Sequence, residues 1–200
     1  PLGVDIDRVY CQDFSISGIV IGGSGSASSG ESAMSIGSLI VTNSSRTPTS
    51  YTSNVAQNTP NATSDTVSWT GISEPYFGFL LLRSADGATN WEVVPNLSKP
   101  IQGDTSFIAT KTSGETWQYR LVTCTVGAQF NRLKACGANV IQTEYVGVGL
   151  WLNNIAAFSA QSLYCEQRPA TIQRATLCGV LAEGSSLHIS QAWVEDASFA

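Results

Sequence analysis

The chain has 200 residues, a formal net charge of −5 at pH 7, 42% hydrophobic residues and only 12% charged residues. The charged share is about half of that in an average soluble protein, and the 10 lysine and arginine residues are scattered, so nucleic acid is not an expected partner. No apolar run is long enough to cross a bilayer, so membrane insertion is not expected. Such polar, weakly charged surfaces are common on adhesins, capsids and fibre tips.

The N-terminal part is expected to contain one hairpin. Residues 1–3 are typical of the remnant of a cleaved tag. Residues 14–21 alternate and then become continuously apolar, and residues 34–42 are again largely apolar after the glycine- and serine-rich run 22–30. Short apolar runs of this kind predict strands, and the small polar residues between them predict an exposed loop. We therefore expect strands 14–21 and 34–42 to pair as a hairpin.

Residues 43–68 mark the best internal boundary. They consist almost wholly of Ser, Thr, Asn, Pro and other small residues, which bury too little apolar area to form a core. We expect them to lie largely on the surface. They separate an N-terminal shoulder, residues 4–68, from a head, residues 69–200.

The head is organised around residues 105–126. β-rich runs lie on both sides of Gly114, and the second run places Trp117, Tyr119 and Leu121 on one face. Aromatic and β-branched residues suit a pleated sheet, and glycine can adopt a positive φ in the break. The stretch predicts a chain reversal between two strands, the second of which is long and central.

The other apolar runs of the head predict further strands separated by turns. We expect strands near residues 76–82, 116–126, 145–152, 176–182 and 186–194, a polar loop over residues 127–139, and at most a turn or two of helix over residues 155–163. Period-2 alternation with turn residues between the runs is typical of sheet proteins. The sequence therefore predicts an all-β fold, an antiparallel β-sandwich of the jelly-roll type.

Residues 145–152 supply the best candidate for a ligand-binding aromatic side chain. Val148 and Leu150 share one face of this strand, and Trp151 lies on the opposite face. Tryptophan is frequent at surfaces that bind partners, and the turn Asn153-Asn154 follows directly. We therefore predict Trp151, Asn153 and Asn154 as ligand-binding residues.

Residue types that carry catalysis or bind metals are sparse. His188 is the only histidine, and it lies within a predicted strand, where a structural or exposed role is far more common than a place in a triad. One histidine excludes a three-histidine zinc site. The five cysteines include no C-x-x-C pair and are expected to be buried thiols or disulfide staples. We predict no catalytic residue, metal or cofactor, although a carboxylate pair for glycoside hydrolysis depends on spatial distance and could come from any of the 15 acids.

A loose pattern runs through the second half of the chain, from about residue 69. It consists of Asn96, Phe107, Gly114 with Trp117 and Tyr119, Leu150 to Asn153, Val180 to Gly184, and Ser198-Phe199. In this pattern the chain resembles the globular heads of the tumour necrosis factor and complement-type jelly-roll superfamily. The resemblance implies a ten-stranded jelly roll that forms trimers through an aromatic-rich face. It also implies loops that bind receptors or glycans, as in similar heads at the tips of phage fibres and viral spikes.

These observations favour a non-enzymatic head that binds a host cell-surface receptor or glycan, as a homotrimer on a virion surface or an extracellular surface. The low charge would let three copies pack with few unpaired charges, and Trp151 is the residue expected at the seam. A monomeric bacterial pilus-tip adhesin is the main alternative, and a secreted jelly-roll hydrolase is the second. The mass in solution would separate the trimer from the monomeric adhesin.

Overall fold

The computed structural model describes residues 3–14, 17–22, 33–44, 50–51, 56–58, 63–70, 78–87, 89–166 and 177–195. All sixteen elements in these ranges are β-strands, which confirms the all-β prediction. Within the same ranges, no helix is long and apolar enough to span a membrane.

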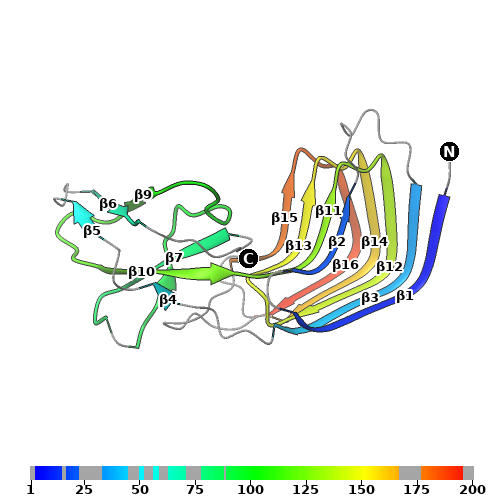
Figure 1. Ribbon diagram of the computed structural model, residues 1–200, viewed down its shortest axis with the longest axis horizontal. Helices are drawn as coiled ribbons and strands as arrows, with labels where there is room; N and C mark the ends of the chain where they lie inside the picture. Colours follow the sequence, from blue (N-terminus) through cyan, green and yellow to red (C-terminus); the bar gives the residue numbers. More distant parts are fainter. Residues whose placement is uncertain are drawn as a thin grey trace.

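Two parallel sheets form one half of the molecule (Figure 1). The five-stranded sheet has the order β1 (Gly3–Phe14), β3 (Ala33–Ser44), β12 (Ala135–Glu144), β14 (Ala157–Glu166) and β16 (Leu187–Glu195). The four-stranded sheet has the order β2 (Ser17–Gly22), β11 (Val126–Asn131), β13 (Val148–Asn153) and β15 (Cys178–Glu183). Every neighbouring pair in both sheets is parallel.

The order of the strands shows that the chain winds as a coil. It passes from the four-stranded to the five-stranded sheet in β2–β3, β11–β12, β13–β14 and β15–β16, and each pair stacks on the next. We call this part the solenoid. The prediction of an antiparallel jelly roll is therefore wrong for these two sheets, whose neighbouring strands are all parallel. Parallel neighbours cannot be joined by a tight hairpin, and here the chain passes through the other sheet between them.

The corners that follow β11, β13 and β15 share one recurring conformation. Arg132, Asn154 and Gly184 occupy equivalent positions and have φ values of 54°, 54° and 56°. The stacking hydrogen bonds continue through this corner, since Arg132 N donates to Asn153 O at 2.8 Å and Asn154 N donates to Glu183 O at 2.8 Å. A residue that tolerates the left-handed region is thus required at each of these corners.

The solenoid encloses its own apolar core. The core consists of the buried residues Phe14, Ile36, Leu39, Val41, Ala128, Phe130, Leu133, Cys136, Ala138, Ile141, Val146, Leu150, Leu152, Ile155, Phe158, Ala160, Leu163 and Cys165. Phe130 and Phe158 meet edge to face across the two sheets, with ring centroids 5.3 Å apart. Stacked coils bury equivalent positions repeatedly, so the core is a set of columns rather than one cluster of distant residues.

A column of glycines lets the two sheets converge at one side of this core. Gly18, Gly127, Gly149 and Gly179 take the same position in the four coils. A Cβ atom at Gly149 would lie 2.5 Å from the Gly179 carbonyl oxygen and 2.8 Å from Cys165 Sγ. No side chain fits there, because non-bonded atoms need a separation of about 3.5–4.0 Å.

The other half of the molecule is an antiparallel body formed by part of residues 45–125, inserted between β3 and β11 (Figure 1). One sheet has the order β4 (Ser50–Tyr51), β10 (Gln118–Cys124), β7 (Gly78–Ser84) and β8 (Glu92–Val93), and the other has the order β5 (Ala56–Asn58), β6 (Ser64–Ser68) and β9 (Ser106–Thr110). Its core is continuous with Val126, Val148 and Trp151 on the outside of the solenoid. The two halves therefore share an apolar interface.

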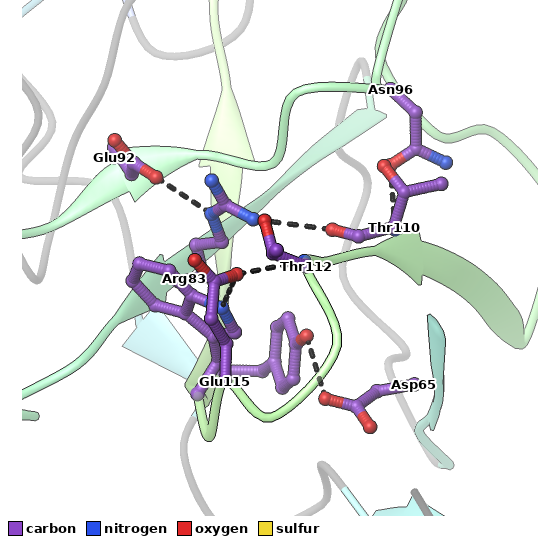
Figure 2. Close-up of polar contacts among 9 residues, drawn as sticks. Asp65, Arg83, Glu92, Asn96, Thr110, Thr112 and Glu115 are labelled. Atoms are coloured by element: carbon purple, nitrogen blue, oxygen red, sulfur yellow. Dashed lines mark hydrogen bonds and ion pairs between the residues drawn. The ribbon is translucent and has the colours of Figure 1, made fainter. Parts of the chain in front are cut away.

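A polar network holds the antiparallel body together (Figure 2). Lys111 Nζ lies 2.7 Å from Asp65 Oδ1, and Tyr119 donates a hydrogen bond of 2.9 Å to the second oxygen of Asp65. Burial, followed by this hydrogen bond, raises the pKa of Tyr119, which keeps the phenol a donor. Arg83 stacks on Trp117 at 4.1 Å and pairs with Glu92 at 2.6 Å. The polar groups of this network are hydrogen-bonded or ion-paired to one another, so we assign the network a role in stabilising the antiparallel body.

Several expectations about local structure are wrong. Strands β2 and β3 lie in different sheets and do not pair, so the hairpin of residues 14–21 and 34–42 does not form. Residues 127–139 are not a polar loop, since they contain most of β11 and the start of β12, and residues 155–163 lie largely in strand β14. The strands expected on both sides of Gly114 are present as β9 and β10, but they belong to different sheets and do not pair with each other. In each case the strand finds its partner in another coil or sheet, at a distance in sequence that local patterns do not reveal.

The division at residues 68 and 69 does not follow the sheets. β3, from the expected shoulder, pairs with β12 from the expected head, and β6 pairs with β9. Part of residues 43–68 is also buried, because Asp65 and Val67 face the core of the antiparallel body. Residues 1–2 and 23–32 lie outside the described residues.

Candidate functional site

The outer face of the five-stranded sheet carries the candidate site. Neighbouring strands lie about 4.8 Å apart, and in-register parallel pairing places equivalent side chains side by side in columns. One column consists of Asp5, Ser35, Gly137, Ser159 and His188, from the five strands in order. Their neighbours Ile36, Ala138 and Ala160 point into the solenoid core, so the column itself faces outward.

Small residues in the middle of this column leave a trough in the face. The trough has a volume of about 470 Å³ and is lined by residues of all five strands and of the corner before β16. The small residues Ser35, Gly137 and Ser159 form its floor. Asp5 and His188 lie at its two ends, on the edge strands β1 and β16. Four strand spacings make it roughly 19 Å long. We call this feature the trough.

The lining of the trough is mostly neutral and rich in hydroxyl groups. Ser35, Ser159 and Ser186 each offer one donor and two acceptor sites, and Met34 and Leu187 add apolar surface. A long, open groove of this kind can bind a chain-like ligand that carries many hydroxyl groups together with apolar C–H faces. It encloses no compact ligand, because both ends open at the edges of the sheet.

The geometry of the acid and the histidine limits what the trough can do chemically. Asp5 and His188 lie about four strand spacings apart, roughly 19 Å. Asp5 is the only carboxylate among the described residues that line the trough, so these residues offer no carboxylate pair for glycoside hydrolysis. Ser159 is the direct neighbour of His188 on the adjacent strand. A serine–histidine–acid triad needs a third group that orients the imidazole, and Asp5, the acid that lines the trough, is too far away to do so. Among the described residues, no group of three or more His, Cys, Asp or Glu side chains could hold a metal ion.

The predicted ligand-binding residues lie outside the trough. Trp151 is only 3% exposed, because it packs into the core shared with the antiparallel body, so its expected place at a surface or subunit seam is wrong. Val148 joins the same core, whereas Leu150 and Leu152 point into the solenoid, so the strand does not alternate simply across Gly149.

Asn153 and Asn154 form the corner between β13 and β14. Asn154 has a φ of 54° and donates a hydrogen bond of 2.8 Å from Nδ2 to Asn153 Oδ1. Asparagine adopts this left-handed conformation more readily than most residues, which explains its place there. Neither side chain lines the trough.

The five cysteines are all free thiols, and Cys124, Cys136 and Cys165 are buried. The expectation of buried thiols is thus met for these three. Disulfide staples do not form.

The sequence contains a signal for the trough that was missed. Four segments share a glycine at the second position followed by apolar residues, beginning at Ser17, Val126, Val148 and Cys178. Aligning them superposes Gly137 and Ser159, whereas Ser35 and His188 reach the same column only through the strand register. Internal repeats indicate stacked architectures, but here the insertion after β3 and the longer connection after β14 make the spacing irregular.

Comparison with models of protein families, with curated proteins and with solved structures finds no match for this chain. The residues that carry the resemblance to tumour necrosis factor-type heads lie in both halves of the molecule. Phe107 and Tyr119 belong to the antiparallel body, and Leu150 to Asn153 belong to a parallel sheet.

Proposed function

We propose that the chain is a glycan-binding attachment module, and that an extended glycan lies in the trough along the axis of the solenoid. The observation that carries this proposal is the trough itself, which crosses all five strands and is lined by serine hydroxyls, exposed backbone and small apolar groups. The glycan belongs to a host cell surface, and the module acts at a virion surface or another extracellular surface.

Two features support a polymeric glycan over a small metabolite. Ligand pockets for small molecules bury most of the ligand in a concave, mainly apolar cavity, whereas the trough is shallow and open at both edges. Stacked coils also present the same kind of residue at regular steps of about 4.8 Å, so successive units of a polymer meet similar surroundings. Several weak contacts along one chain then add through effective concentration.

The proposal is tested by filling the trough. Ser159 and Ser162 both lie on β14 and both directly adjoin a buried core residue, Ala160 and Leu163 respectively, but only Ser159 lines the trough. Ser159→Tyr should abolish binding to those members of a panel of immobilised cell-surface polysaccharides that the unmodified protein binds. Ser162→Tyr is the matched control, and it should bind as the unmodified protein does.

Two results would count against this function. The first is the failure of the unmodified protein to bind any polysaccharide of the panel above the level of an unrelated protein. The second is equal binding by the Ser159→Tyr and Ser162→Tyr variants, which would place the contact elsewhere.

A further inference from the structure

A second feature runs across the outer face of the five-stranded sheet, nearer the C-terminal ends of its strands. One column contains Tyr10, Ile40, Gln142, Tyr164 and Trp193. Tyr10 is 59% exposed and Trp193 is 62% exposed, although large aromatic side chains are usually well buried. We call Tyr10, Gln142, Tyr164 and Trp193 the aromatic stripe. It lies about five residues along each strand from the trough, which corresponds to roughly 17 Å.

A carboxylate or amide accompanies each member of the stripe two residues further along the same strand. Tyr164 donates to Glu166 Oε2 at 3.3 Å, Trp193 donates to Glu195 Oε2 at 3.4 Å, Gln142 donates to Glu144, and Tyr10 donates to Gln12 Oε1 at 2.9 Å. These bonds hold the acceptors beside the rings. Each carboxylate accepts about four hydrogen bonds, so accepting positions remain.

The acids of this column form a ladder of like charges. Glu144, Glu166 and Glu195 are direct neighbours on three adjacent strands. Like charges directly opposite one another in a sheet are destabilising. The ion pairs in the described part of the chain lie elsewhere, at Arg83–Glu92, Lys99–Glu183 and Lys111–Asp65. A bound cation would therefore relieve repulsion that the ion pairs of the described residues do not offset.

The surroundings of the ladder are consistent with a negative potential. The hydrogen bond with Glu166 and then its charge raise the pKa of Tyr145, and Glu144 and Glu195 act in the same direction. Tyr145 donates to Glu166 Oε1 at 2.8 Å, so Glu166 is held by two tyrosines. A glycan that carries carboxylates or sulfates would meet repulsion on this part of the face.

We propose that the aromatic stripe binds an amine-bearing saccharide, with its ammonium groups on Glu144, Glu166 and Glu195 and its sugar faces on Tyr164 and Trp193. Charge complementarity selects a cationic ligand. Exposed aromatic side chains favour an organic cation or an apolar sugar face over a metal ion. The inference rests on the proposed function only in assigning the ligand to the saccharides. It adds a second subsite on the same face and names the charge that this subsite accepts.

The test compares two ligands with the same sugar backbone, one with free amines and one in which every amine is acetylated and therefore uncharged. Calorimetric titration is carried out with a glucosamine trisaccharide and with its fully N-acetylated counterpart, both at about pH 6. The amine form should bind, and its affinity should fall as added salt screens the attraction. The acetylated form should bind at least fivefold more weakly than the amine form. A trisaccharide is too short to bridge the stripe and the trough, so failure of one proposal leaves the other standing.

Variants assign the binding to the stripe. Glu166→Gln keeps the shape and hydrogen-bonding capacity but removes the charge, and it should weaken binding of the amine form about two- to fivefold, the size of one exposed ion pair. Trp193→Ala should weaken it by a similar factor. Asp104→Asn, at an exposed acid of the antiparallel body, is the control and should change nothing.

Three outcomes would overturn the inference. Equal affinity for the amine and acetylated forms would show that charge is not recognised. Unchanged binding in both the Glu166→Gln and Trp193→Ala variants would place the ligand elsewhere. Displacement of the amine trisaccharide by millimolar calcium would show that the ladder binds a metal ion instead.

Discussion

Lys111 and Asp65 form an ion pair of 2.7 Å in which each side chain is only 5% exposed. The pair joins the loop after β9 to β6, and Tyr119 of the other sheet completes it. Removing one partner of a buried pair leaves an uncompensated charge, which typically costs about 3–5 kcal/mol. The ion pair lies within one sheet, and the hydrogen bond from Tyr119 to Asp65 links that sheet to the other sheet of the antiparallel body.

We expect Lys111→Met to lower the free energy of unfolding by about 3 kcal/mol, measured by urea denaturation. Lys99→Met is the matched control, because Lys99 pairs with Glu183 at 2.9 Å but its side chain is 60% exposed. That change should cost less than about 1 kcal/mol. Equal losses in the two variants would show that the buried pair has no special weight.

The glycine column predicts a second difference between two variants. Gly149→Ala places a methyl group against the Gly179 carbonyl oxygen and Cys165 Sγ, and should cost about 3 kcal/mol or prevent folding. Gly114→Ala meets no atom within 4 Å, although its φ is +89°. It should cost only about 1–2 kcal/mol, from backbone strain. Thermal unfolding of both proteins gives the comparison, and a milder effect at Gly149 would contradict the close approach of the coils.

The buried thiols predict a loss of stability at alkaline pH. Burial raises the pKa of Cys136 and Cys178 from the ordinary 9.0 to about 12, and that of Cys165 to about 11. Below pH 9 these thiols are protonated in both the folded and unfolded states, and their contribution is complete. Above pH 9 the thiols of the unfolded chain ionise before those of the folded protein, so the free energy of unfolding falls between pH 9 and about 12. Urea unfolding across this window should show a smaller fall in Cys136→Ala than in the unmodified protein, and identical slopes would argue against it.

His188 is the direct neighbour of Ser159, and this pair offers the one specific test of a hydrolase. We expect no turnover of polysaccharide that depends on His188. In His188→Ala, the release of reducing ends should equal that of the unmodified protein. A large loss of turnover in a variant with an unchanged circular dichroism spectrum would favour the hydrolase over the attachment module.

Self-association as a homotrimer stays a prediction, and sedimentation velocity at tens of micromolar tests it. Trp151 no longer marks the seam, because it is buried within the chain. Trp151→Lys should therefore destabilise the fold, by about 3–5 kcal/mol, rather than dissociate an assembly. A monomer in the unmodified protein would favour the adhesin alternative.

Local patterns were sufficient to predict many strands but not their partners. The runs at residues 34–42, 145–152 and 186–194 correspond to β3, β13 and β16, because alternating or short continuous apolar runs are typical of strands. Parallel or antiparallel pairing depends on contacts between distant segments. Residues 127–139 contain the polar corner residues Asn131, Arg132 and Lys134. These residues made the whole segment read as a loop, although strands lie on both sides of the corner.

The candidate site was harder to predict than the strands. Trp151 was chosen because an aromatic residue on the minor face of a strand suggests exposure, and the antiparallel body that covers it cannot be inferred from that strand. Trp193 was not among the predicted ligand-binding residues, yet it is exposed. The trough depends on the absence of large side chains at Ser35, Gly137 and Ser159, and small residues leave a weak pattern in a chain with 18 glycines and many serines.

The insertion of residues 45–125 also bears on the order in which the molecule folds. Strands β11 to β14 are contiguous in sequence and can stack by closing short loops, whereas β2 and β3 reach β11 and β12 only across the whole insertion. Loop closure costs more entropy as the loop grows, and contacts between distant segments slow folding. Pulse-labelling hydrogen exchange should therefore detect protection in β12 and β14 before β1 and β3. Strands β1 to β3, which precede the insertion, are then the last to join a stack that has already formed.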